Sequence, residues 1–201
     1  MAGREATVAE VIAEVEKDRI FYDQSGGGAT LSGGEPLSQL RFTVRILAEL
    51  KARKIHAALD TSGFASWESL WKAASLADLV LYDLKMVDAV KHAAYTGVSN
   101  RIILENLRRL ASAGRPIAVR IPLAAGVNDG PENIRQTIEL LKPLPAVRRV
   151  DILRYHQGGR EKYKNLGQSD AFEIYDPPSA ERMEEIRRDF ADAGFTVTIG
   201  G

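Results

Sequence analysis

Apolar residues recur every three or four positions through several parts of the chain, which is the pattern of amphipathic helices. The first such helix begins at Thr7, which stands three residues before Glu10 as in a capping box, and it continues to about Arg19. Ser66 and Ser179 are suited to cap later helices. Further helices are predicted over residues 37–53, 66–76, 100–113, 131–142 and 179–193, with a short turn or helix over 92–95.

Short apolar runs between these helices predict β-strands over residues 29–32, 55–61, 77–85, 116–123, 149–156 and 195–199. Alternation of strand and helix is typical of βα units in a parallel sheet. Right-handed crossovers curl such a sheet toward a barrel, and six strands are too few for the eight-stranded form. We therefore expect an α/β fold, a partial and open (β/α)6 barrel that forms one domain over residues 1–201.

Composition narrows the class of protein. The 201 residues carry 27 basic and 27 acidic side chains, so the formal net charge of +0 gives no indication of a nucleic acid or an anionic membrane as partner. No apolar run approaches the roughly 20 residues that span a bilayer, and the first residues lack the apolar core of a signal peptide. We expect a cytoplasmic protein. The chain has no cysteine, which excludes disulfides and cysteine-ligated metal clusters formed by its own residues.

The stretch from Gly26 to Gln39, GGGATLSGGEPLSQ, combines a short strand with a glycine-rich exit. Gly33 and Gly34 allow positive φ angles and a close approach of the main chain to a ligand, and Pro36 suits the first turn of a helix. Such a turn lies where open α/β sheets bind ligands, and the carboxylate of Glu35 is expected to point into that crevice. The plainer interpretation is a βα loop that merely tolerates glycine.

Charged or polar residues close five successive predicted strands, and the carboxyl ends of parallel strands meet at one mouth. Taken singly, Lys85 is more often a solvated lysine, Asp60 a turn former and His156 a donor to a nearby carbonyl. Together they predict a site, because carboxylates attract a cation while lysine and arginine attract a carboxylate or phosphate. The expected ligand is a small zwitterion resembling an amino acid. The strand-end residues are Glu35, Asp60, Thr61, Asp83, Lys85, Arg120 and His156.

Several motifs occur together in a characteristic order. They are FYDQSGGGATLSGGEPLSQ, LDTSGF, LYDLK, YTGVSN, VRIPLAAGVND and YHQGGREKY. From about Thr7 onward the chain resembles the activating enzymes of glycyl radical enzymes, of the pyruvate formate-lyase activase type. The resemblance implies a radical S-adenosylmethionine barrel that uses a 4Fe-4S cluster to cleave S-adenosylmethionine. The resulting 5′-deoxyadenosyl radical abstracts hydrogen from a glycine of a partner glycyl radical enzyme, with flavodoxin or ferredoxin as electron donor.

The resemblance also implies roles for individual residues. Ser32, Gly33, Gly34 and Glu35 resemble the residues that hold the methionyl amino group. A monovalent cation is implied at Asp60, Thr61 and Asp83. Further contacts with S-adenosylmethionine are implied for Lys85 and His156, and a place near cofactor and substrate peptide for Arg120.

One departure from the family pattern is large. The CxxxCxxC loop that binds the cluster follows the first barrel strand in the family, and this chain has no cysteine. We expect the chain to correspond to a truncated form that lacks this strand and loop, and to be inactive alone. The strand over residues 29–32 is then expected at a sheet edge, which favours self-association.

Two other functions remain open at this point. The chain could be a non-catalytic module that binds S-adenosylmethionine or the partner enzyme. It could instead be a barrel lyase with Lys85 as a Schiff-base lysine, although the motifs of a phosphate-binding barrel are not evident. The sequence does not identify which glycyl radical enzyme is the partner.

Overall fold

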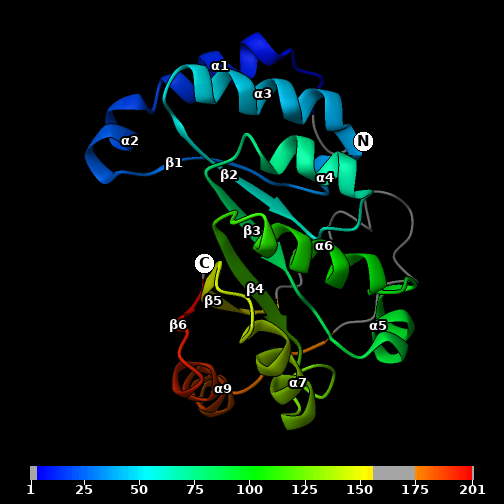
Figure 1. Ribbon diagram of the computed structural model, residues 1–201. Helices are drawn as coiled ribbons and strands as arrows, with labels where there is room; N and C mark the ends of the chain where they lie inside the picture. Colours follow the sequence, from blue (N-terminus) through cyan, green and yellow to red (C-terminus); the bar gives the residue numbers. More distant parts are fainter. Residues whose placement is uncertain (1–3, 156–174, 201) are drawn as a thin grey trace.

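The computed structural model describes residues 4–155 and 175–200, and the two ranges form one layered α/β structure (Figure 1). Its strands are β1 Gly28–Leu31, β2 His56–Thr61, β3 Leu79–Asp83, β4 Ile117–Leu123, β5 Val147–Arg154 and β6 Thr196–Ile199. Its α-helices are α1 Val8–Glu16, α2 Arg19–Ser25, α3 Leu40–Ala52, α4 Trp67–Ala74, α5 Ala89–Thr96, α6 Arg101–Ser112, α7 Pro131–Leu141 and α9 Ala180–Asp192, and a 3-10 helix, η1, covers Pro36–Gln39.

All six strands are parallel and stand in the order of the sequence, from β1 at one edge to β6 at the other. This order winds in one direction, as in a barrel, and does not reverse as in a doubly wound sheet. In the described residues β1 and β6 are the two edges, so the sheet is open. The prediction of a partial six-stranded barrel is confirmed, as is the position of the first strand at an edge.

The two faces of the sheet differ in chemistry. One face carries large apolar side chains that are almost fully buried against the helices, among them Leu59, Tyr82, Val119, Ile121 and Ile152. Because side chains alternate along a strand, the residues between them point to the opposite face. That face is polar near the carboxyl ends of the strands. It carries Asp60, Asp83, Arg120, Asp151 and Thr198.

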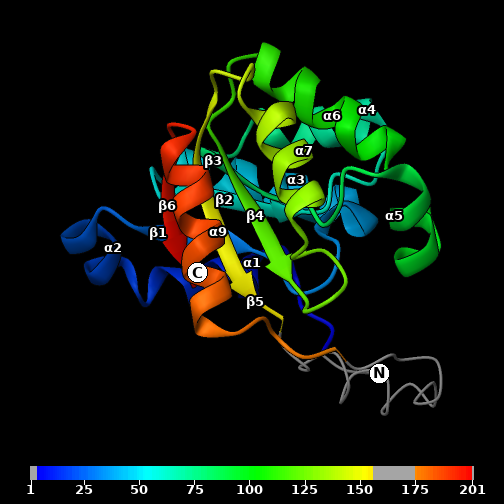
Figure 2. The same ribbon diagram turned by 90° about the horizontal axis from the view of Figure 1, so that it is seen from below.

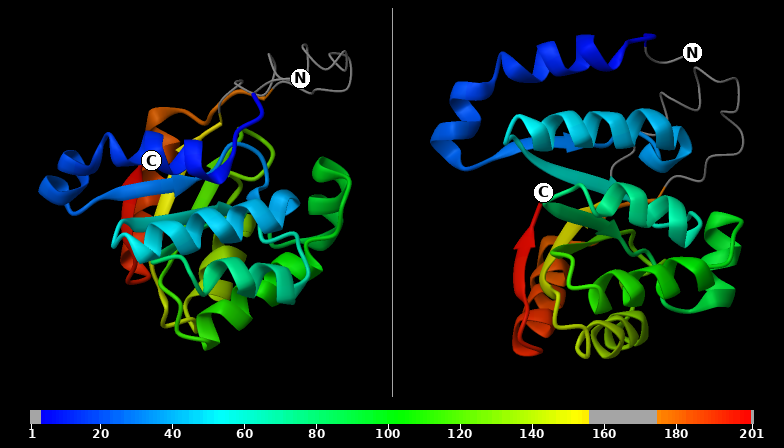
Figure 3. Two further views of the ribbon diagram at one scale, coloured as in Figure 1. Left: turned by 90° about the horizontal axis from the view of Figure 1, so that it is seen from above. Right: turned by 45° about the horizontal axis from the view of Figure 1, so that its top comes forward.

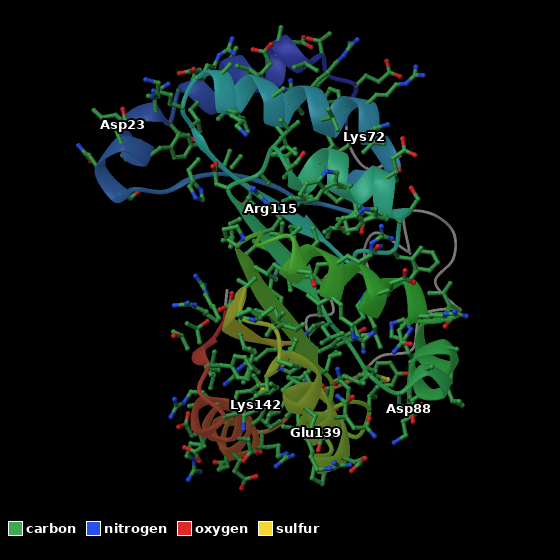
Figure 4. All side chains as sticks on the ribbon, viewed as in Figure 1. Asp23, Lys72, Asp88, Arg115, Glu139 and Lys142 are labelled. Atoms are coloured by element: carbon green, nitrogen blue, oxygen red, sulfur yellow. The ribbon has the colours of Figure 1, made fainter. Side chains whose placement is uncertain are left out.

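The helices form the outer layer. In Figure 1, α1 packs on α3 at the top and α7 packs on α9 at the bottom, with the sheet between them. Figure 2 shows α9 alongside the last two strands. Charged helix side chains such as Lys72 and Glu139 point outward (Figure 4). The apolar stripes predicted from periodicity therefore face the sheet and form the core.

Two predicted elements differ from the structure. The first helix ends at Glu16, and α2 follows it from Arg19 to Ser25, where the sequence predicted an irregular approach to the glycines. No residue of α2 is buried, so this helix has no apolar stripe that periodicity could reveal, and it projects from the body in every view (Figure 3). The predicted helix over 37–53 is divided into η1 and α3, because Gln39 takes a non-helical conformation.

The remaining predicted elements are present, with ends that differ by at most three residues from those predicted. The segment around His92 is an eight-residue helix, α5, capped by Asp88, whose carboxylate accepts hydrogen bonds from two amides of the first turn. Among the described helices, none has both the length and the apolar character required to cross a bilayer.

Candidate functional site

A row of polar residues crosses the sheet at the carboxyl ends of the strands. Asp83, Arg120, Asp151 and Thr198 are partners in register on β3, β4, β5 and β6. Since residues in register point to the same face, their side chains form one line. Asp60 on β2 lies on this face as well. It is in register with Leu81, two residues before Asp83 on β3. The predicted convergence of Asp60, Asp83 and Arg120 is present.

Arg120 is the centre of this group. Its Nη1 lies 2.6 Å from Oδ2 of Asp60, so the guanidinium of β4 reaches across β3 to a carboxylate of β2. Its Nε lies 3.8 Å from Oδ1 of Asp83. The same Oδ2 of Asp60 accepts a hydrogen bond of 2.6 Å from the hydroxyl of Ser32. Ser32 thereby links the glycine-rich turn to the strand-end group.

The carboxylate of Asp83 is only partly satisfied by hydrogen bonds. Its Oδ1 is buried and accepts no hydrogen bond in the structure. Burial raises the pKa of Asp83, and the negative charges of Asp60 and Glu35 add to this effect, while Arg120 and Lys85 oppose it. A buried carboxylate oxygen without a donor indicates the place of a water molecule or an ion. The donor set at Asp60 and Asp83 therefore fits a cation.

A cleft of about 600 Å³ opens beside these residues. Such a volume is within the range of small-molecule sites. One part of its wall is charged and includes Asp83, Lys85 and Arg120, and the other includes the apolar Leu153, Tyr155 and Ile199 together with the charged Arg154. The side chain of Lys85 is exposed here. A Schiff-base lysine is usually desolvated, so this exposure gives no support to the lyase interpretation.

A second hollow, of about 670 Å³, lies between α1 and α3. Its wall combines small apolar side chains such as Ala9 and Ala48 with an ion pair between Glu16 and Arg53. None of the strand-end residues reaches it. The cleft at the strand ends is therefore the better candidate for a functional site.

The glycine-rich turn has the backbone that its sequence predicts. Gly33 and Gly34 take φ angles of +97° and +137°, where side chains are strained. The carboxylate of Glu35 accepts four hydrogen bonds: from the amide of Leu37 at 3.2 Å, the hydroxyl of Thr61 at 2.7 Å, and the amide and hydroxyl of Ser62 at 3.0 and 2.7 Å. A carboxylate has about four acceptor sites, so this side chain is fully used within the protein. The turn can offer a ligand its main-chain groups.

Thr61 lies on the other face of the sheet from Asp60 and Asp83. It is 2% exposed, and its hydroxyl donates to Glu35 and accepts from the amide of Gly63 at 3.0 Å. Of the three residues predicted to hold a cation, Asp60 and Asp83 thus have side chains on the open face, and the side chain of Thr61 does not. His156, the last of the predicted residues, lies outside the described residues.

Three buried asparagines hold the loops that carry the site, and sequence reasoning missed them. The side-chain amide of Asn106 donates to the carbonyls of Gly63 and Ala65, both at 2.9 Å. Asn128 donates to the carbonyls of Lys85 and Pro122, at 2.9 and 2.8 Å. The third, Asn100, donates to the carbonyls of Met86 and Val87 at 3.0 and 2.8 Å.

Each of these side-chain amides donates to two main-chain carbonyls near the end of a strand. One signal was available in the sequence, because Asn106 falls on the apolar stripe of its helix in phase with Ile103, Leu107 and Leu110. A polar residue at a core position must have partners, which here are the loop after β2.

The described residues do not fit an iron–sulfur cluster. The chain has no cysteine, and in residues 4–155 and 175–200 no three side chains of His, Asp or Glu gather closely enough to hold a metal ion. A zwitterion and an alkali cation suit the strand-end group better, since Asp83, Lys85 and Arg120 line one cleft and Asp60 is paired with Arg120.

The fold and the site together define the class of protein. The model of the radical SAM superfamily matches residues 1–141, and the chain belongs to this superfamily. Its relatives within the superfamily are the activating enzymes of glycyl radical enzymes, so the family suggested by the motifs is confirmed.

The similarity extends along the whole chain. The trans-4-hydroxy-L-proline dehydratase activating enzyme of Clostridioides difficile is 43% identical over 204 residues, which cover 100% of this chain and 67% of the relative. The choline trimethylamine-lyase activating enzyme of Oleidesulfovibrio alaskensis is 41% identical, over 83% of this chain and 55% of its own length. A crystallised domain of a pyruvate-formate lyase-activating enzyme from Bacteroides vulgatus superposes with a TM-score of 0.71 at 34% identity, covering 87% of this chain and 99% of that domain. The chain thus spans between about half and two thirds of the length of these curated relatives.

Proposed function

We propose that this chain provides the S-adenosylmethionine-binding strand ends of a glycyl radical enzyme activating enzyme. The observation that carries the proposal is the charged group of Asp83, Lys85 and Arg120 at one cleft, with Asp60 paired to Arg120 and an unsatisfied carboxylate oxygen on Asp83. A methionyl group is itself a zwitterion, so it matches this arrangement of opposite charges.

Each part of the site has a task in this proposal. The main chain of the turn formed by Ser32, Gly33, Gly34 and Glu35 binds the methionyl amino group. Asp60 and Asp83, with the main chain of Thr61, hold a monovalent cation beside the methionyl carboxylate. Lys85, Arg120 and His156 complete the contacts with the ligand, and the apolar wall near Leu153 and Tyr155 excludes water from it.

The chemistry of the family requires more than these residues. S-adenosylmethionine supplies the 5′-deoxyadenosyl group that abstracts hydrogen from a glycine of the partner enzyme, a glycyl radical enzyme. The 4Fe-4S cluster needed for its reductive cleavage does not fit the residues of this chain. We therefore propose that the 201-residue chain by itself binds S-adenosylmethionine without cleaving it, and that flavodoxin or ferredoxin, the usual electron donors, act only where a cluster is present. A single domain and a cytoplasmic location belong to the same proposal.

Calorimetric titration with S-adenosylmethionine tests the binding site. We expect a dissociation constant between the micromolar and low millimolar range for the wild-type chain. Binding is expected to be lost in Asp83→Ala and Lys85→Ala and kept in Asp23→Ala, a control on the projecting helix α2 (Figure 4). Absence of saturable binding to the wild type, or equal binding by Asp83→Ala, would overturn the proposal.

A second candidate function is a non-catalytic module that binds S-adenosylmethionine or the partner enzyme, and the absence of cysteine favours it. Anaerobic incubation with iron, sulfide and dithionite, together with a segment of a relative that carries the CxxxCxxC motif, separates the two functions. Formation of 5′-deoxyadenosine in this mixture would exclude the module, whereas binding without any cleavage product, with or without that segment, would support it.

A further inference from the structure

Acidic residues lie on both sides of Arg120 in the sheet. Its guanidinium contacts the acidic residues on one side only. Asp151 lies beside it on β5, and on the other side are Asp83 on β3 and, one strand further, Asp60 on β2. Asp151 already has its own partners, because its Oδ1 accepts from Nε of Arg149 at 2.7 Å and from the hydroxyl of Thr198 at 2.6 Å. The charge of Asp151 is therefore neutralised, and the unpaired acidic charge lies toward Asp60 and Asp83.

One guanidinium does not satisfy both of these carboxylates. Arg120 makes a hydrogen bond of 2.6 Å to Asp60, and this leaves its Nε 3.8 Å from Asp83, too far for a hydrogen bond. Oδ1 of Asp83 is buried and without a donor as a result. Arg120 thus offsets one of the two negative charges and leaves one acceptor unsatisfied, which a small cation with several ligands would satisfy.

Asp60 does not depend on Arg120 alone. The hydroxyl of Ser32 donates to the same oxygen at 2.6 Å, so departure of the guanidinium would leave this carboxylate in place with one donor. Arg120 itself lies on the wall of the cleft and is 24% exposed. Its side chain consequently has room to turn toward a ligand without opening the core.

We propose that Arg120 is an internal counter-cation, which takes the place of the monovalent cation at Asp60 and Asp83 while the cleft holds no ligand and is displaced when the cation and S-adenosylmethionine bind. The inference rests on the proposed function, since it concerns the same cleft. Two positive charges compete for one pair of carboxylates, so the displaced guanidinium becomes available to the carboxylate of the ligand. Binding of cation and ligand is therefore coupled, and each strengthens the other.

Removal of Arg120 should create a cation site that functions without S-adenosylmethionine. The experiment compares thermal unfolding of Arg120→Gln in KCl and in choline chloride of equal ionic strength, with no ligand added. We expect the unfolding midpoint of this variant to be higher in KCl by ~3 °C, because K⁺ binds the folded state only. The wild type should give the same midpoint in both salts, because its arginine occupies the site.

Two further variants make the result specific. Arg149→Gln is the matched control, since it removes the guanidinium from Asp151 on the same face and outside the cleft, and its midpoint should not depend on the cation. Asp60→Asn in the Arg120→Gln background should abolish the effect of K⁺. A K⁺ effect of equal size in the wild type or in Arg149→Gln, or its absence in Arg120→Gln, would overturn the inference.

If Arg120→Gln does not fold, titration of the wild type with S-adenosylmethionine in the two salts replaces it, and equal affinity in KCl and choline chloride would be the negative result. The two proposals fail separately. Saturable binding of S-adenosylmethionine with no K⁺ effect in Arg120→Gln contradicts only the counter-cation. A K⁺ effect in Arg120→Gln without any binding of S-adenosylmethionine contradicts only the proposed function.

Discussion

The hydroxyl of Thr61 donates a hydrogen bond of 2.7 Å to the carboxylate of Glu35. This contact joins the turn after β1 to the carboxyl end of β2, two segments that no ladder hydrogen bond connects at that point. The amide and hydroxyl of Ser62 complete the connection. The glycine-rich turn is therefore held in its shape by the protein itself, before any ligand arrives.

Replacement of Glu35 should destabilise the fold. Glu35→Ala removes the acceptor of four hydrogen bonds, and we expect it to lower the free energy of unfolding by about 2 kcal/mol. Glu35→Gln should be harmful as well, because the amide that replaces one oxygen faces donors. Urea unfolding measures both, with Glu68→Ala as the control, since Glu68 only pairs with Lys72 on the surface. A stable Glu35→Ala variant would show that the turn does not need this connection.

A methyl group at position 63 should be more harmful than one at position 97. Both glycines have positive φ, +70° and +76°. A Cβ on Gly63 would lie 1.8 Å from the hydroxyl oxygen of Tyr82, whereas one on Gly97 would meet nothing within 4 Å. Gly97→Ala should cost about 1 kcal/mol for backbone strain alone, and Gly63→Ala about 3 kcal/mol or more. Equal losses in chemical denaturation would mean that Tyr82 moves away freely.

The stability of the chain should depend on the charge of Asp83. Burial, reinforced by the charge of Asp60, raises the pKa of this carboxyl above its ordinary value of 3.8. The folded state then binds more protons than the unfolded state above pH 3.8, so the free energy of unfolding falls as the pH rises through the raised pKa. Asp83→Asn lacks this effect.

Asp83→Asn should accordingly be more stable than the wild type at neutral pH, and its advantage should disappear as the pH falls toward 3.8. Urea titrations over this range, with both proteins in the same buffers, measure the difference. Lower stability of Asp83→Asn at neutral pH would show that attraction to Arg120 outweighs burial. The variant should bind S-adenosylmethionine less tightly at every pH, because it lacks a carboxylate of the site.

Asn128 should influence both stability and binding. It is 3% exposed, it donates to the carbonyls of Lys85 and Pro122, and its own oxygen accepts from the amide of Ala124 at 2.8 Å. Asn128→Ala should cost about 3 kcal/mol and weaken binding of S-adenosylmethionine through displacement of Lys85. Asn128→Asp keeps the acceptor and loses the two donors, so an equal loss in stability would assign the effect to the carbonyls. Unchanged binding in Asn128→Ala would show that Lys85 keeps its position by other contacts.

Much of the fold could be predicted from the sequence because its strands and helices carry strong and distinct periods. The alternation of strand and helix was enough for a parallel, open sheet, whereas the position of the first strand at an edge followed from the resemblance to the family. Helix α2 could not be predicted, because its apolar residues Ile20 and Phe21 are exposed and indicate no buried face. The division at Gln39 depends on a local backbone angle that no pattern of apolar residues records.

The residues that form the candidate site could be predicted more readily than the directions in which their side chains point. Residues at the ends of parallel strands converge for reasons of topology, which brought Asp60, Asp83 and Arg120 together correctly. The direction of the Glu35 side chain depends on the φ angles of Gly33 and Gly34. Alternation along β2 places the side chain of Thr61 on the other face of the sheet from Asp60. A guanidinium that crosses an intervening strand, as Arg120 does, follows from side-chain length and charge and has no counterpart in residue spacing.

The alternation along each strand has a consequence for how this protein can vary. On β3, Val80 and Tyr82 are fully buried, while Leu81 and Asp83, which alternate with them, are only partly buried. Exchange of the open-face residues leaves the packing intact, so new ligand preferences can arise, or be selected in a library, by substitutions at every second position. Deletion of one residue within a strand has the opposite effect, since it moves the charged residues into the core and the core residues to the cleft. These strands can therefore change by substitution of open-face residues, but they do not tolerate insertion or deletion of a single residue.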